Sequence, residues 1–147
     1  MGTPRKTVRD YMSPSLHTIG KEQTLATAHA MMRKWQIRHL PVLEGGKIVG
    51  VLSLRDLHLV ETLKDVDPED VLVEDAMTPD PYTIGPDADL RVVAMEMATR
   101  KLGSAVVARD GRVAGIFTTI DALRALFELL ETLEREPSSA PRLETRP

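Results

Sequence analysis

The chain repeats itself with a period of 65 residues, and this feature limits its possible folds most. A shift of 65 positions aligns residues 8–57 with residues 73–122 without a gap. Unrelated sequences of ordinary composition would agree at only about 6% of positions. A repeat of this length indicates two copies of one supersecondary unit that bury apolar surface against each other. The identical pairs are Val8/Val73, Asp10/Asp75, Met12/Met77, Pro14/Pro79, Thr18/Thr83, Ile19/Ile84, Gly20/Gly85, Leu25/Leu90, Met32/Met97, Val42/Val107, Gly46/Gly111, Gly50/Gly115 and Asp56/Asp121.

Each copy predicts the order strand–helix–strand–strand–helix. Short strands are expected around residues 17–19 and 82–84. Thr24 and Asp89 are good N-cap residues, and the helices expected after them, 24–36 and 89–101, each carry one apolar face. Trp35 falls on the first of these faces, so it is expected in the core; the alternative is that its ring stacks on a base.

A hairpin and a second helix complete each copy. Gly45-Gly46 and Asp110-Gly111 are strong two-residue turns, so hairpins are expected over 39–52 and 105–117. The second helices should open at Ser53 and Thr118, and the last should extend from about residue 120 to 135.

These elements predict an α+β fold of two β-α-β-β-α repeats, packed sheet to sheet with pseudo-two-fold symmetry. The first repeat is assigned to residues 5–62 and the second, with its extended helix, to residues 73–135. Residues 63–72, which contain Pro68, form the linker. Residues 136–147 are expected to be a disordered tail. A unit of about 60 residues is only marginally stable alone, so the two copies should depend on each other.

Composition removes several classes of protein. The net charge of −3 argues against a general nucleic-acid binder. The absence of cysteine excludes disulfides, zinc–thiolate sites and thiol catalysis. No apolar run is long enough to span a membrane, and the first residues do not look like a signal peptide. We therefore expect a cytoplasmic protein with neither nucleic acid nor membrane among its partners.

Three groups of residues stand out: Met-Ser-Pro (12–14) with Met-Thr-Pro (77–79), Arg-His-Leu-Pro-Val (38–42), and the strand-to-helix segments 50–56 and 115–121. They resemble the CBS domain, and two copies in order at a fixed spacing resemble a tandem CBS pair, or Bateman module, over about residues 5–132. The resemblance implies a regulatory sensor of an adenosine ligand such as AMP, ADP, ATP or S-adenosylmethionine, held between the repeats. It also implies modules that dimerise head-on into a flat disc.

The doubled Ser/Thr-x-x-Asp segment is the main candidate for binding chemistry. A helix start offers unpaired amide donors and a dipole that favours a phosphate, and a carboxylate can accept hydrogen bonds from ribose hydroxyls. By the resemblance, Asp56 and Asp121 bind ribose, and Ser53 and Thr118 bind phosphate. The alternative is a capping box, in which both side chains only cap their own helix.

The adenine ring needs an apolar slot, and cations could neutralise the phosphates. Arg38, His39 and Arg55 are the candidate cations, although they could equally be ordinary surface or structural side chains. His39, Pro41 and Arg55 become Ser104, Val106 and Ile120 in the second copy, so the two clefts should differ, with phosphate-rich ligands preferring the one that receives Arg55. The candidate walls, which could equally be ordinary strand residues, are Thr18, Ile19, Leu40, Pro41, Thr83, Ile84, Ser104, Ala105 and Val106.

No catalytic motif is present, so we expect no enzyme activity, no required cofactor and an unidentified protein target. His17, His29 and His58 have no ligand spacing, so the sequence assigns no metal. The competing functions are a scaffold with empty clefts and, more weakly, a nucleotide-processing enzyme.

The last helix carries a long apolar stripe at three- and four-residue steps. A soluble monomer seldom exposes such a surface, so the stripe predicts a homodimer; the alternative is that the helix folds back on its own chain. The residues of the stripe are Ile120, Leu123, Leu126, Phe127, Leu130 and Leu133.

Overall fold

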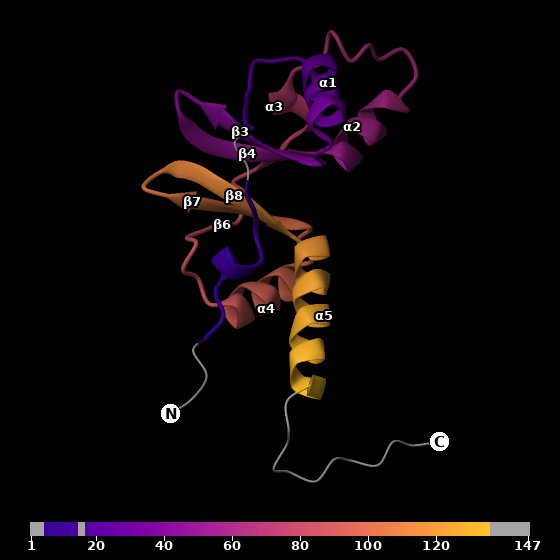
Figure 1. Cartoon of the computed structure of the whole chain (residues 1–147). Helices are drawn as coiled ribbons and strands as arrows, with labels where there is room; N and C mark the ends of the chain where they lie inside the picture. The colour runs from indigo at the N-terminus through magenta and orange to yellow at the C-terminus, as the bar shows by residue number, and fades with distance from the viewer. Residues whose placement is uncertain (1–4, 15–16, 136–147) are drawn as a thin grey trace, which may run out of the picture.

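The computed structural model describes residues 5–14 and 17–135 of the 147-residue chain. The tail predicted to be disordered, residues 136–147, lies outside the described residues. The described part is α+β, as predicted, with two sheets of four strands each and helices on their outer faces (Figure 1).

The first repeat contains β2 (Ile19–Gly20), α1 (Leu25–Trp35), β3 (His39–Glu44), β4 (Lys47–Ser53) and α2 (Leu54–Glu61). The second contains β6 (Thr83–Ile84), α4 (Leu90–Arg100), β7 (Ser104–Arg109), β8 (Arg112–Thr118) and α5 (Thr119–Arg135). The bounds of α1, β3 and β4 match those of α4, β7 and β8 at the 65-residue shift without any offset. The repeat in the sequence is therefore a repeat in the structure, and the predicted element order is confirmed.

The predicted helix caps form in both copies. The side chain of Thr24 accepts a hydrogen bond from the backbone N–H of Thr27 at 3.2 Å, and that of Asp89 accepts one from Arg91 at 2.9 Å. These bonds satisfy amide donors that a helix start leaves open.

The segment that opens each repeat crosses over to the other repeat. β1 (Ser13–Pro14) pairs with β8, and β5 (Thr78–Pro79) pairs with β4. The short helices before these strands, η1 (Val8–Asp10) and α3 (Val73–Ala76), also cross over to the other repeat. Val8 is buried in the core of the second repeat and Val73 in the core of the first. Each sheet therefore contains strands from both halves of the chain.

Glycine at two strand positions permits this exchange. A Cβ placed on Gly115 would lie 2.6 Å from the carbonyl oxygen of Ser13, and one on Gly50 would lie 2.9 Å from that of Thr78. Backbone atoms cannot give way as a flexible side chain can. The two glycines thus leave space for the crossing segments.

Three apolar layers follow from the alternation of side chains along the strands. Leu40 and Val42 point toward α1 and α2 and belong to the core of the first repeat. Pro41 therefore points the opposite way, toward the other sheet. Val106 is the counterpart of Pro41 in the second repeat. It pairs in register with Ile116 of β8, and both side chains are buried. Residues of both repeats therefore meet in the layer between the two sheets, where a site shared by the repeats is expected.

Trp35 was predicted to lie in the core, and this is wrong, because its side chain is 46% exposed. Its ring stacks on the imidazole of His17, with centroids 4.4 Å apart, and Lys34 lies over it at 5.0 Å. Trp35 is the last residue of α1, where the apolar face of the helix extends beyond the buried layer.

Candidate functional site

A cavity of about 470 Å³ lies where α5 begins, against the connection between α1 and β3. Residues from both repeats line it, as expected for a site between them. Four predicted site residues contribute, namely Arg38, His39, Thr118 and Asp121. The full lining is Ser13, Pro14, His17, Gln36, Ile37, Arg38, His39, Ile116, Thr118, Ile120, Asp121 and Arg124.

Asp121 is the buried acid of this cavity, with only 2% of its surface exposed. Its Oδ2 accepts hydrogen bonds from the backbone N–H and the hydroxyl of Thr118, at 2.9 and 3.1 Å. Its Oδ1 accepts from the Ser13 hydroxyl at 2.9 Å and from Nη1 of Arg124 at 3.2 Å. A carboxylate can be buried at low cost only when its oxygens are satisfied in this way.

The matching acid of the first repeat, Asp56, is half-buried and makes a capping box. Its Oδ2 accepts from the backbone N–H of Ser53 at 2.9 Å, and its own N–H donates to the Ser53 hydroxyl at 3.1 Å. Thr118 and Asp121 make the same reciprocal pair, with the Asp121 N–H donating at 3.2 Å. In both copies the capping box forms, which leaves a ligand role for the same side chains open.

His39 lies between the two motifs. Burial lowers the pKa of His39 below its usual 6.5; the charges of Asp56 and Asp121 oppose this change, and Arg38 adds to it. The imidazole is therefore neutral near pH 7 and can both donate and accept a hydrogen bond.

A second cavity, of about 540 Å³, shares Arg38 and His39 with the first. It lies along α2, and Ser53 and Arg55 also line it. Arg38 and the neutral His39 thus lie close to the helix starts of both repeats, whereas Arg55 lines only the cavity at its own helix start.

Sequence reasoning missed one cation, Arg124. It lines the first cavity and is held at Asp121, three residues before it on α5. The repeat could not indicate Arg124, because the 65-residue shift places Leu59 at the corresponding position of the first repeat. The one signal in the sequence is that Arg124 follows Asp121 by three residues, which places both on one face of a helix.

The other predicted wall residues divide into three groups. The side chains of Ile19, Leu40 and Ala105 lie in the cores beneath the helices, and Ile84 packs against the core of the second repeat. Pro41 and Val106 are buried and belong to the layer between the sheets. The remaining residues are closer to solvent: Thr18 and Ser104 are half-buried and Thr83 is exposed.

A doubled β-α-β-β-α unit with exchanged opening strands and paired helix-start acids defines a tandem CBS module. The family description "CBS domain" matches residues 8–60 and 73–128, so the chain belongs to the CBS domain family. Among residues 5–14 and 17–135, no helix is long and apolar enough to cross a bilayer.

Solved CBS pairs are similar to this chain along nearly all of their length. The CBS domain pair of the protein MJ0100, solved with 5'-methylthioadenosine and S-adenosyl-L-methionine, is 26% identical, with a TM-score of 0.76 over 86% of this chain and 99% of that one. CBSX2, a protein from Arabidopsis thaliana solved in complex with AMP, is 26% identical, with a TM-score of 0.72 over 84% and 98%.

Among curated proteins, inosine-5'-monophosphate dehydrogenase from Korarchaeum cryptofilum is 31% identical over 79% of this chain. The match spans only 23% of that enzyme. The likeness therefore covers a minor part of the enzyme's length.

Proposed function

We propose that this chain is a regulatory module that binds an adenosine ligand between its two repeats and thereby modulates a protein target. The observation that carries the proposal is the position of Asp121 and Thr118 at the start of α5, lining a cavity with Arg38 and His39 from the other repeat. The CBS pairs solved with AMP and with S-adenosylmethionine support the same ligand class.

Asp121 supplies the ribose contact in this proposal. Its Oδ1 is held by the Ser13 hydroxyl and by Arg124, and both partners can turn outward toward the cavity that they line. A ribose hydroxyl can then donate to the carboxylate. Because the acceptor is charged, such a bond contributes about 1.5–3 kcal/mol to binding.

The phosphate end of the ligand would meet the start of α5 and the cations beside it. The first backbone N–H groups of a helix and its dipole favour an anion. Arg38 and Arg124 line the same cavity, both as exposed side chains, so they can reach a phosphate that projects from it. A nucleotide should therefore bind more tightly than the corresponding nucleoside.

The two sites should not be equal. Arg124 has Leu59 as its repeat counterpart, and Arg55 has Ile120. The start of α5 thus has Arg124, and the start of α2 has Arg55 at a different position of the repeat. Arg38 and His39 line the cavity at both helix starts. We expect a titration with two different affinities, or with one measurable site.

A thermal-shift panel of AMP, ADP, ATP, NADH and S-adenosylmethionine tests this function. A ligand present at 100 times its Kd stabilises the folded chain by about 2.7 kcal/mol. At least one adenosine compound should raise the Tm. Guanosine monophosphate serves as the matched control, since it keeps the ribose and phosphate and changes only the base.

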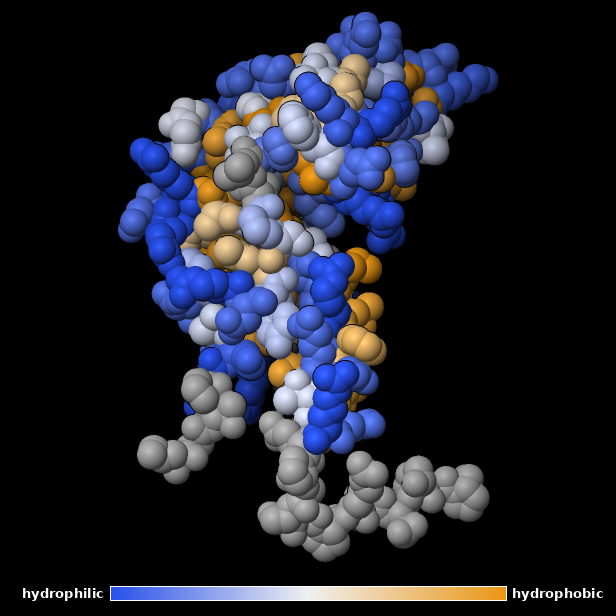
Figure 2. All heavy atoms as spheres, viewed as in Figure 1, coloured by the Kyte–Doolittle hydropathy of each residue, from blue (hydrophilic) through white to orange (hydrophobic). Residues whose placement is uncertain are grey.

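The alternative function, a ligand-free dimerisation scaffold, draws support from α5. Its apolar stripe is exposed, from 48% at Leu130 to 66% at Leu133, and Figure 2 shows hydrophobic residues along one side of this helix. Within the described residues, α5 is therefore not folded back on its own chain in a way that covers the stripe. A dimer is compatible with the sensor, whereas empty clefts are not.

A further inference from the structure

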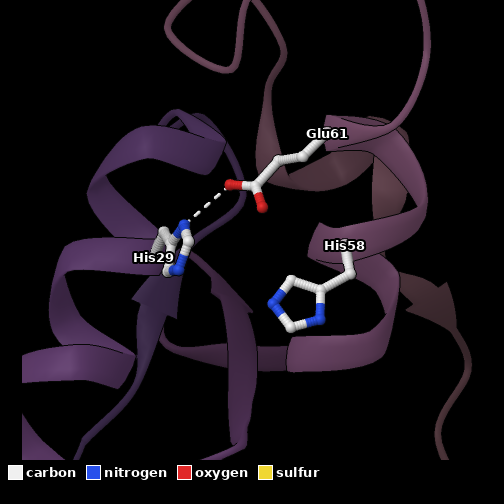
Figure 3. Close-up of side chains that lie close together, drawn as sticks. All are labelled: His29, His58 and Glu61. Atoms are coloured by element: carbon white, nitrogen blue, oxygen red, sulfur yellow. Dashed lines mark hydrogen bonds and ion pairs between the residues drawn. The ribbon is translucent and has the colours of Figure 1, made fainter.

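Two histidines and a glutamate come together on the outer side of the first repeat. His29 lies on α1, and His58 and Glu61 lie on α2, pointing toward a common centre (Figure 3). One donor atom from each lies within 4.8 Å of the other two. Nδ1 of His29 is 2.7 Å from Oε2 of Glu61, and the two imidazole rings meet edge to face with centroids 6.1 Å apart.

The packing of α1 against α2 creates this cluster. His58 and Glu61 are three residues apart, so one helix presents both on the same face. His29 reaches them from the neighbouring helix. The sequence spacing that led us to assign no metal could not show this, because it compares positions along the chain and not between helices.

We propose that His29, His58 and Glu61 form a binding site for a divalent transition metal, with Zn²⁺ as the ion that fits best. Imidazole nitrogen and carboxylate oxygen are ordinary zinc ligands, and two histidines with one glutamate leave a fourth position open. Calcium and magnesium fit poorly, because both favour oxygen ligands.

A modest adjustment converts the cluster into a metal site. Two ligand atoms about 2.0–2.1 Å from one tetrahedral Zn²⁺ lie roughly 3.3 Å apart. The 2.7 Å contact between Nδ1 of His29 and Oε2 of Glu61 must therefore widen by about 0.6 Å. Ligand atoms that lie as far apart as 4.8 Å must close by up to about 1.5 Å. All three side chains are at least partly exposed, so rotation about their own bonds can supply this movement.

The surroundings leave room for a fourth ligand. His29 and Glu61 line a cavity of about 490 Å³ whose other wall includes the linker residues Asp67 and Glu69. Their carboxylates add negative charge, and Arg33 on the same cavity opposes it. Water, or one of these carboxylates, can complete the coordination.

The repeat itself predicts the number of ions. The counterparts of His29, His58 and Glu61 at the 65-residue shift are Ala94, Leu123 and Leu126, none of which binds a metal. The chain should therefore take one Zn²⁺, on the first repeat only. None of the three ligands lines the cavity at Asp121, so Zn²⁺ binding and adenosine binding at that cavity can each fail without the other. His58 also lines the second cavity, along α2.

Calorimetry of the tag-free full chain with ZnCl₂ tests the site. We expect one ion per chain, release by EDTA, and, with Co²⁺ as a substitute, the visible absorption of a tetrahedral ion. His58→Ala is the sharpest variant, because it removes one ligand and leaves the His29–Glu61 contact in place. It should weaken Zn²⁺ binding at least tenfold, and Glu61→Gln should do the same.

Two controls make the outcome decisive. Glu128→Gln changes an exposed glutamate on α5 and should leave Zn²⁺ affinity unchanged. His58→Gln replaces His58→Ala if the alanine variant does not fold, as judged by circular dichroism. The absence of Zn²⁺ binding to the wild-type chain, or equal binding by the wild type and the His58 and Glu61 variants, would overturn the proposal.

Discussion

The hydroxyl of Ser13 donates a hydrogen bond to Oδ1 of Asp121 at 2.9 Å, across 108 positions of the sequence. Ser13 belongs to the exchanged strand of the first repeat, and Asp121 to the helix start of the second. The exchange of opening segments thus reaches the candidate binding acid directly. Folding of the two repeats and assembly of the site are therefore linked.

The two motif aspartates should differ in their effect on stability. Asp56→Ala removes the acceptor for the backbone N–H of Ser53 in the capping box of α2, and it should lower the free energy of unfolding by about 1 kcal/mol. Asp121→Ala also leaves Ser13 and Arg124 without their acceptor, so we expect a loss of about 2–3 kcal/mol. Urea denaturation without ligand measures both. Equal losses would mean that the bonds from Ser13 and Arg124 contribute nothing to folding.

Stability should depend on pH through His39. Burial lowers the pKa of His39 in the folded chain, so below its usual 6.5 the unfolded chain binds this proton more readily than the folded one. The contribution of His39 is therefore present above pH 6.5 and lost as the pH falls through the lower folded pKa. Urea denaturation between pH 7.5 and 5.5 should show a smaller loss for His39→Gln than for the wild type. Parallel profiles would contradict this role.

Gly115→Ala should destabilise the fold by about 1–3 kcal/mol, because the new methyl group meets the backbone of the crossing strand at Ser13. Gly103→Ala is the matched control. A Cβ at Gly103 would meet nothing within 4 Å, so its effect should stay within about 0.5 kcal/mol. Thermal unfolding compares the two, and a tolerated Gly115→Ala would mean that the crossing segment shifts easily.

The exposed stripe of α5 should place the chain in a homodimer. Light scattering at micromolar concentration should give twice the chain mass of 16.3 kDa. Phe127→Glu, in the middle of the stripe, should shift the particle to the monomer mass. Lys47→Glu, on a hairpin far from α5 in the sequence, should not. A wild-type particle of 16.3 kDa would show that the dimer prediction is wrong.

The sequence predicted the repeated elements because each carries a local signal: the caps Thr24 and Asp89, and the glycine turns. It did not predict the exchange of the opening segments. β1 and β5 are two residues long, and nearly the same motif in both copies does not indicate which sheet each copy joins. Val8 and Val73 are the same residue at the same position of the repeat, so the sequence does not indicate which core each of them enters.

The site was predictable to the same extent. Thr118 and Asp121 are three residues apart in the sequence motif, so one helix turn brings them together. Arg124 lies three residues after Asp121 on α5, so its contact with Asp121 is also local. The placement of His39 between both aspartates depends on how the two sheets pack. The cluster of His29 with His58 and Glu61 depends on the contact between two helices, which the spacing of residues along the chain does not report.

Calorimetric titration of AMP into the wild-type chain and into Asp56→Asn, Asp121→Asn and the double variant tests the central claim most directly. Asparagine keeps the shape of the side chain and removes the charge that accepts from ribose. The wild type should bind AMP, and loss of a charge-assisted bond of about 1.5–3 kcal/mol should weaken binding about 10- to 150-fold in at least one single variant. Binding should fall furthest in the double variant. No heat from the wild type at millimolar AMP, ADP, ATP or S-adenosylmethionine, or full affinity in the double variant, would contradict an adenosine site at these aspartates.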